Sequence, residues 1–185
     1  MLVIKHKPII FFLFIFTVFA SAEISQTAQL NKLFNTLSKI NNIQEANLFE
    51  KKIWAVWNKH PKNKKLTDKL QLGTELMYER NYKFALKVFN NVIKTDPSWS
   101  KAWNKRATLL YFMKKYQRSL SDIDKVLSIE PRHFGALSGR AQIFIELQEY
   151  QKAINDLKKL RKIYPVIISN DLVKKLEKLA KGLNI

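Results

Sequence analysis

The chain has 185 residues, no cysteine and a formal net charge of +18 at pH 7. The absence of cysteine excludes disulfide bonds, thiolate metal sites, cysteine nucleophiles and a lipid anchor attached through cysteine. The positive charge favours anionic partners, although lysines scattered over helix exteriors are also typical of an ordinary solvated surface.

A signal peptide is the first predicted element, over residues 1–22. Lys5 and Lys7 give it a basic start, the apolar stretch Ile9–Phe19 is too short to span a bilayer, and Ala-Ser-Ala at 20–22 offers a cleavage site. An uncleaved membrane anchor is the alternative. Cleavage would leave 163 residues (185 minus 22) and a net charge of +16, because two lysines are removed. The sequence therefore predicts export, in a bacterium to the periplasm.

Two amphipathic helices are expected next, over about residues 26–40 and 43–58, within an N-terminal pair that spans 23–61. Asn42 and Glu45 resemble a capping box at the start of the second helix. The apolar faces of this pair would otherwise be exposed. We therefore interpret the pair as an N-terminal cap on a helical solenoid.

A period of 34 residues governs the next part of the chain, where prolines recur at Pro97, Pro131 and Pro165. Four further columns share this period: Tyr82, Tyr116 and Tyr150; Gly73, Ala107 and Ala141; Ala85, Ser119 and Ala153; Phe89, Ile123 and Leu157. Apolar residues at helical spacing predict two helices in each unit, which approach closely across the small residues. Proline ends the second helix.

These columns resemble the tetratricopeptide-repeat family, whose 34-residue unit carries an aromatic, a small residue, an alanine and a closing proline at these offsets. The resemblance covers three units, 66–99, 100–133 and 134–167. Ser119 replaces the usual alanine, and Lys69 stands where the first unit should have a large apolar residue. The resemblance implies an all-α fold, a right-handed superhelical solenoid of helix-turn-helix units. Residues 103–108 and 130–137 are also similar to short exported tetratricopeptide proteins of alphaproteobacteria.

The last predicted element, over residues 168–185, is a helix that caps the C-terminal end of the solenoid. Apolar residues form one stripe along it and lysines occupy the rest of its surface: Leu172, Val173, Leu176, Leu179 and Leu183 against Lys174, Lys175, Lys178 and Lys181. A stack of repeats needs such a half-polar helix because it otherwise ends in open core.

No set of residues in the sequence suits catalysis. The histidines, His6, His60 and His133, include no pair at metal-ligand spacing, and Asp122 and Asp124 point in different directions on a helix. The sequence has neither a glycine-rich phosphate loop nor a nucleophile elbow. We therefore expect no enzymatic activity, no cofactor and no bound metal.

In the last two units an arginine column and an aspartate column lie 16 residues apart. They pair Arg106 with Asp122 and Arg140 with Asp156. The first unit has Leu72 and Val88 in these columns. This joint replacement predicts a structural ion pair between the helices of each unit, because a partly buried charge without its partner is costly. A ligand-binding role for the arginines is the alternative.

The resemblance implies that the first helix of each unit lines a concave groove. Its candidate residues are Thr74, Met77, Tyr78, Lys101, Asn104, Thr108, Tyr111, Phe112, Ser138, Gln142, Ile145 and Glu146. Aromatic and amide side chains of this kind suit a peptide ligand. The alternative is that Met77, Tyr111 and Ile145 complete the core between neighbouring helices.

Some members of the family grip a carboxylate with cations on these helices. Lys105 could serve in such a clamp, but Gly135 and Gly139 stand where the third unit would supply its cations. We therefore expect no carboxylate clamp.

We predict a non-enzymatic scaffold that binds a peptide or helix of an envelope protein in this groove. The alternative is electrostatic attachment to an anionic membrane surface or an acidic polymer, through the C-terminal helix and a lysine-rich edge of Lys51, Lys52, Lys59, Lys62, Lys64 and Lys65. Nucleic acid is not the expected partner of an exported protein. Only attachment to a polyanion should weaken steeply with salt.

Overall fold

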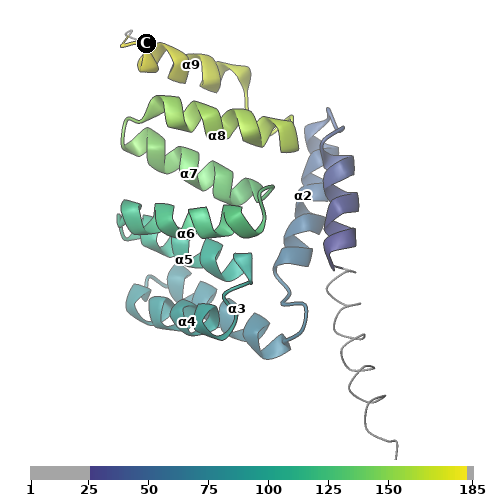
Figure 1. Ribbon diagram of the computed structural model, residues 1–185, viewed down its shortest axis with the longest axis vertical. Helices are drawn as coiled ribbons and strands as arrows, with labels where there is room; N and C mark the ends of the chain where they lie inside the picture. The colour runs from purple at the N-terminus through teal and green to yellow at the C-terminus, as the bar shows by residue number, and fades with distance from the viewer. Residues whose placement is uncertain (1–25, 183–185) are drawn as a thin grey trace, which may run out of the picture.

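The computed structural model describes residues 26–182, and every regular element in that range is a helix (Figure 1). A first helix over residues 26–37 and α2 (Ile43–Trp57) form an N-terminal pair. Three further pairs and a last helix follow: α3 (Lys64–Tyr78) with α4 (Tyr82–Thr95), α5 (Ser100–Phe112) with α6 (Tyr116–Ile129), α7 (Phe134–Glu146) with α8 (Tyr150–Ile163), and then α9 (Asn170–Ala180). The predicted signal peptide lies outside the described residues. Among residues 26–182, none of the helices is both long enough and apolar enough for a membrane crossing.

The three repeat units stack in chain order (Figure 1). Within each unit the two helices pack together, and the second helix of one unit packs on the first helix of the next. At the end of the stack α9 packs on α8 and buries Val173 and Leu176. The all-α solenoid predicted from the repeat is confirmed.

Small residues set the distance between the helices of a unit. A Cβ atom at Gly73 would lie 2.6 Å from Cε1 of Phe89, so glycine allows α3 to approach α4. Ser119, which replaces the usual alanine, donates a hydrogen bond from Oγ to the carbonyl oxygen of Ala107 at 2.8 Å. This bond satisfies a hydroxyl group that is fully buried.

The turn inside each unit uses a left-handed residue. Arg80, Lys114 and Gln148, which are again 34 residues apart, have φ angles of 61°, 56° and 59°. The next residue donates its amide to a carbonyl five positions earlier, as from Lys115 to Leu110 at 2.8 Å. This helix ending favours glycine at the left-handed position. The three side chains therefore add local strain to the turns.

The N-terminal pair does not cap the first unit, and that part of the prediction is wrong. Figure 1 shows the pair alongside the stack rather than beyond α3. One buried core contains Phe34 and Trp57 of the pair together with Phe134 and Tyr164 of the third unit. The outer face of the first unit stays open, and Leu72 there is 49% exposed.

The third unit receives the pair because it has aromatic residues at two repeat positions where the other units have none. Phe134 and Tyr164 stand where the second unit has Ser100 and Glu130. The hydroxyl of Tyr164 also donates a hydrogen bond to Oδ1 of Asn47 in α2, at 2.9 Å. The large aromatic side chains of the pair therefore find their apolar partners at the third unit.

Candidate functional site

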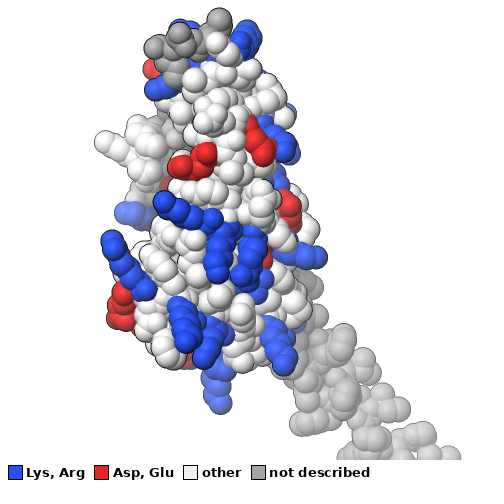
Figure 2. Space-filling model, turned by 90° about the vertical axis from the view of Figure 1, so that its left-hand side faces the viewer, with Lys and Arg blue, Asp and Glu red and all other residues white. Residues whose placement is uncertain are grey.

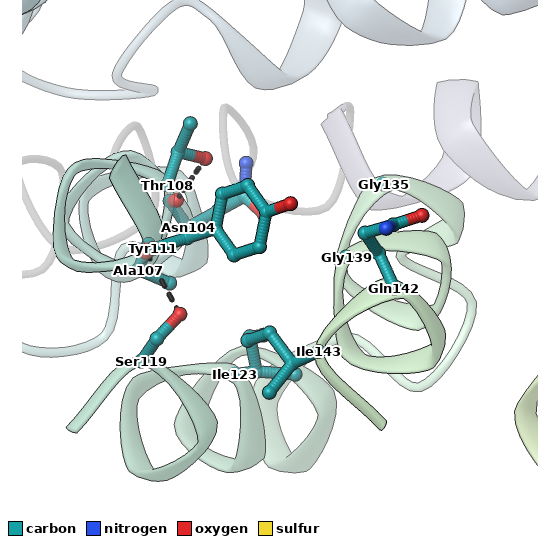
Figure 3. Close-up of a pocket in the computed structure, with 10 residues that line it drawn as sticks. All are labelled: Asn104, Ala107, Thr108, Tyr111, Ser119, Ile123, Gly135, Gly139, Gln142 and Ile143. Atoms are coloured by element: carbon teal, nitrogen blue, oxygen red, sulfur yellow. Dashed lines mark hydrogen bonds between the residues drawn. The ribbon is translucent and has the colours of Figure 1, made fainter. Parts of the chain in front are cut away.

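The candidate groove contains a cavity of about 110 Å³ between α5 and α7, with α6 as its floor (Figure 3). It is lined by Asn104, Ala107, Thr108, Tyr111, Ser119, Ile123, Gly135, Gly139, Gln142 and Ile143, four of which are predicted groove residues. Figure 3 shows the Tyr111 ring reaching into this space from α5, with Gln142 across from it on α7. The cavity therefore combines an apolar floor with a phenol and amides at its sides.

Two glycines of α7 shape this cavity in different ways. A Cβ atom at Gly139 would meet only Cδ1 of Ile123, at 4.0 Å, so this glycine leaves open space. A Cβ atom at Gly135 would lie 2.7 Å from Cη2 of Trp54 in α2. Gly135 therefore makes room for an indole of the N-terminal pair, whereas Gly139 leaves the cavity open.

Tyr111 provides a neutral polar group at the cavity. Its ring is half-buried, with its centroid 5.8 Å from that of Tyr116. Burial, followed by the negative charge of Glu146, raises the pKa of Tyr111. The phenol is therefore protonated at neutral pH and can donate or accept a hydrogen bond. Beside it, Nε2 of Gln142 donates to Oε1 of Glu146 at 3.0 Å.

Two exposed aromatic side chains stand at the C-terminal ends of α3 and α5. Tyr78 at the end of α3 is 70% exposed, and Phe112 at the end of α5 is 45% exposed. The rings of Phe112 and Tyr111 have centroids 6.0 Å apart. Nζ of Lys105 lies 6.0 Å from the Tyr78 centroid, and burial lowers the pKa of this lysine. Phe112 and Tyr111 therefore form an adjacent pair of rings, of which Phe112 is exposed.

The other predicted groove residues differ in accessibility. Ser138, Gln142 and Glu146 are exposed, whereas Thr74, Thr108 and Ile145 are half-buried. Oγ1 of Thr74 and Oγ1 of Thr108 donate to backbone carbonyls of their own helices, at 2.8 and 3.0 Å. The hydroxyl groups of both threonines thus have internal partners.

Met77 and Lys101 do not lie on an open surface, contrary to the prediction for the groove. Met77 belongs to the core of the first two units, as the alternative interpretation expected. Lys101 is 3% exposed, and its Nζ lies 3.9 Å from the centroid of the Trp54 ring. Burial, followed by the charge of Lys105, lowers the pKa of Lys101 well below its usual value. The N-terminal pair therefore covers the start of α5.

The two repeated arginines are bound to carboxylates inside the protein. Arg106 donates from Nε and Nη2 to Asp122, both at 2.7 Å. Arg140 donates from the same two atoms to Asp156 at 2.7 and 2.8 Å. The structure brings each predicted pair together, and this two-point geometry occupies most of each guanidinium.

Each arginine also reaches the preceding unit, which the sequence prediction missed. Nη1 of Arg106 donates to Oδ1 of Asn90, and Nη1 of Arg140 donates to Oδ1 of Asp124, both at 2.7 Å. The sequence holds a signal for this contact, because each acceptor lies 16 residues before its arginine. The arginines thus join neighbouring units as well as the helices of one unit.

The two histidines in the described part of the chain have structural partners. Nε2 of His60 lies 2.7 Å from Oδ2 of Asp96, and its Nδ1 accepts from the amide of Asn63 at 3.0 Å, which fixes the linker before α3. Nδ1 of His133 accepts from the amide of Ala136 at 3.1 Å and caps α7. Within residues 26–182, no group of three acidic or histidine side chains could hold a metal ion.

Basic side chains are spread over several faces. In the predicted lysine-rich edge, Lys51, Lys59 and Lys65 are exposed, while Lys64 pairs with Asp68 at 2.8 Å. Figure 2 shows another face, at the left-hand ends of the helices in Figure 1, where Lys and Arg gather mainly in the lower half. The positively charged side chains are therefore spread over several faces of the protein and are not confined to the groove.

The middle unit matches a known family. Residues 100–133, which contain α5 and α6, match the family model described as tetratricopeptide repeat. No curated protein matches the chain significantly.

Solved structures with a similar fold are also tetratricopeptide-repeat proteins. The first such domain of Spaghetti (RPAP3), bound to the HSP90 peptide SRMEEVD, is 18% identical; the match covers 63% of this chain and 91% of that chain, with a TM-score of 0.56. The TPR2B domain of yeast Sti1, in a complex with pHsp70, is 22% identical over 65% and 98% of the two chains, with a TM-score of 0.56. A repeat protein from Parabacteroides merdae is 22% identical over 85% of this chain and 61% of its own length, with a TM-score of 0.58. At these identities the likeness shows the fold.

Proposed function

We propose that this chain, which is a tetratricopeptide-repeat protein, is a non-catalytic scaffold that binds a peptide segment of a partner protein in the groove along α3, α5 and α7. The observation that carries the proposal is the cavity between α5 and α7, where the ring of the lining residue Tyr111 lies 6.0 Å from the exposed ring of Phe112. The similar structures of Spaghetti and Sti1 support it, since both are complexes with chaperone peptides.

The size of the cavity indicates which side chain of a partner would enter it. Its volume of about 110 Å³ is smaller than the roughly 150 Å³ of an engineered protein cavity that binds benzene. An aliphatic side chain therefore suits it better than an aromatic ring. The amides of Asn104 and Gln142 and the hydroxyl of Tyr111 would then hydrogen-bond the backbone of the bound segment.

Truncation of the aromatic residues tests the proposal. Phe112→Ala should weaken partner binding by about 1–3 kcal/mol, which is typical of an interface anchor, and should change stability little because Phe112 is exposed. Tyr111→Ala should also weaken binding. Tyr116→Ala is the control, because Tyr116 packs against the core shared by the second and third units, so its loss should mainly reduce the stability of the protein.

The measurement begins with affinity capture from the native cell envelope and identification of the captured protein. A binding titration of its segment against each variant then gives the change in affinity. Binding that survives both Tyr111→Ala and Phe112→Ala in folded protein would place the binding surface elsewhere. The envelope is the source of choice because residues 1–22 have the pattern of a signal peptide.

A second candidate function is attachment to a polyanion. The exposure of Lys51, Lys59 and Lys65 in the lysine-rich edge favours it. Sedimentation with vesicles of anionic lipid, compared with neutral vesicles, tests this function. Attachment through several lysines should fall by an order of magnitude or more between 50 and 200 mM salt, whereas binding through the apolar cavity should change little.

A further inference from the structure

The N-terminal pair closes one end of the candidate groove. The indole of Trp54 lies against Gly135, which lines the cavity, and over the ammonium of Lys101 at the start of α5. The next turn of α2 places Trp57 on His133, with ring centroids 4.1 Å apart and planes at 5°. The starts of α5 and α7 are therefore covered, while their ends remain open.

The covered surface contains two poorly satisfied polar groups. His133 is fully buried, and within residues 26–182 its Nε2 has no hydrogen-bond partner. Among the described residues, the ammonium of Lys101 has the Trp54 ring as its neighbour and neither a hydrogen bond nor an ion pair. Buried polar groups in folded proteins are almost always paired. Both groups would regain water if the N-terminal pair moved away.

Between described residues, the side-chain hydrogen bonds that join the pair to the rest of the chain past the linker come from Arg132 and Tyr164, and the hydroxyl of Tyr164 also lies 3.1 Å from Oε2 of Glu50. Nη1 of Arg132 donates to Oδ1 of Asn31 at 2.8 Å, and the hydroxyl of Tyr164 donates to Asn47 at 2.9 Å. The aromatic core between the pair and the third unit supplies the rest. The repeat units pack on one another without the pair, and residues 58–63 connect it to α3. Separation of the pair as a body would break this shared core but would leave the contacts between the repeat units in place.

We propose that the N-terminal pair is a detachable cover of the groove, and that a bound partner competes with it. The competition rests on the proposed function, whereas the opening of the cover does not. Opening would extend the cavity past Gly135 along α7 and would expose Lys101 and His133. If the cover is closed most of the time, the apparent affinity for a partner that needs the extended groove falls by the open fraction.

Acid should release the cover. Burial, followed by the charge of Lys101, lowers the pKa of His133 to about 3 in the closed arrangement, and exposure would return it to about 6.5. The charged group that acts on His133 is Lys101 from α5, which has Lys105 as its own charged neighbour, while α2 contributes the indoles of Trp54 and Trp57. Arg132 and Glu130 pair with each other in the loop before α7.

Because the histidine is a base with a lowered pKa, the cover is fully stable above about pH 6.5 and loses stability as the pH falls towards 3. From pH 7.5 to pH 5, His133 alone raises the ratio of open to closed protein about 30-fold. The pKa of Lys101 is also lowered, so its effect has the same sign.

Two glycine variants of α7 test the cover in the full chain. Gly135→Ala places a methyl group 2.7 Å from an atom of Trp54, whereas Gly139→Ala meets nothing closer than 4.0 Å. Hydrogen exchange followed by mass spectrometry should show residues 26–57 exchanging at least tenfold faster than α7 and α8. Gly135→Ala should speed this exchange further and should raise the rate at which an amine-specific reagent acylates Lys101. Gly139→Ala should do neither.

The acid response has its own variants. His133→Phe retains a ring on Trp57, His133→Asn retains a cap for α7, and neither side chain titrates. After correction for intrinsic exchange rates, the wild-type pair should open more readily at pH 5.5 than at pH 7.5, and this difference should be smaller in both variants, where only Lys101 remains to respond. A full response in both variants would contradict the role of His133.

The cover itself is refuted if the pair and the third unit exchange in one step, or if the two glycine variants behave alike. The proposed function fails separately. If the pair opens as expected but filling the cavity with Gly139→Leu leaves partner capture unchanged, the groove is not the binding site. If Gly139→Leu abolishes capture but the pair never opens alone, the groove binds a partner without a cover.

Discussion

Gly139→Ala should make the protein more stable. The residue lies inside α7, where alanine is more favourable than glycine by about 0.8–1 kcal/mol. The added Cβ atom would be 4.0 Å from Ile123, an ordinary contact, so no clash reduces this gain. For a chain of this size the midpoint of thermal unfolding should rise by about 2–4 °C. Urea denaturation followed by circular dichroism gives the free energy of unfolding.

Gly139→Leu completes this test because a longer side chain at the same position would occupy the cavity. Leucine has nearly the helix propensity of alanine, and burial of its extra carbons offsets some crowding in about 110 Å³. We expect stability within about 1 kcal/mol of the alanine variant, with partner capture lost. Gly73→Ala is the opposite control, because its methyl group would lie 2.6 Å from Phe89 and should destabilise. A destabilised Gly139→Ala would refute this account of the cavity, and undiminished capture by folded Gly139→Leu would refute its role in binding.

Three further predictions concern other parts of the chain. Arg106→Leu combined with Asp122→Val introduces the residue types of the first unit, and the pair of changes should reduce the free energy of unfolding by less than the sum of the two single changes. Each single change leaves one charge unpaired, at a cost of about 3 kcal/mol. A double-mutant cycle that shows no coupling would reject the pairing. Lys114→Gly should stabilise by about 0.5–1 kcal/mol in urea denaturation because its φ is 56°, whereas Lys115→Gly, at φ −89°, should not. The exported protein should begin at Glu23 by N-terminal sequencing, and a membrane-bound form that retains Met1 would contradict cleavage.

The repeat units could be predicted from the sequence because their contacts repeat with the same period. Gly73 faces Phe89 across one unit, and Ser119 bonds Ala107 across the next, at positions that the 34-residue columns identify. The charged columns were equally informative, because Arg106 and its carboxylate change together to apolar residues in the first unit. Such pairs can be recognised in the sequence because the residue type at one position restricts the residue type at the other.

The position of the N-terminal pair could not be predicted from the period, because the pair has no repeat columns. The place where the pair docks depends on which repeat unit exposes apolar side chains along the side of the stack. That surface is marked by a departure from the repeat, where Phe134 and Tyr164 replace polar residues of the second unit. The misplacement of Lys101 on an open groove has the same origin. The resemblance to the repeat family placed Lys101 on the groove face of α5, but a segment from outside the repeat covers this residue.

The two glycines of α7 connect the cavity to the cover. Gly135 and Gly139 are four residues apart, so they lie one above the other on the same face of the helix. The first is covered by Trp54 and the second borders empty space. A partner side chain that fills only the cavity would leave Trp54 in place, whereas a segment that continues along α7 past Gly135 must displace the indole. Because Trp54 also shields Lys101, that displacement would hydrate the buried ammonium. The length of the bound segment, rather than the cavity alone, would then decide whether binding opens the cover.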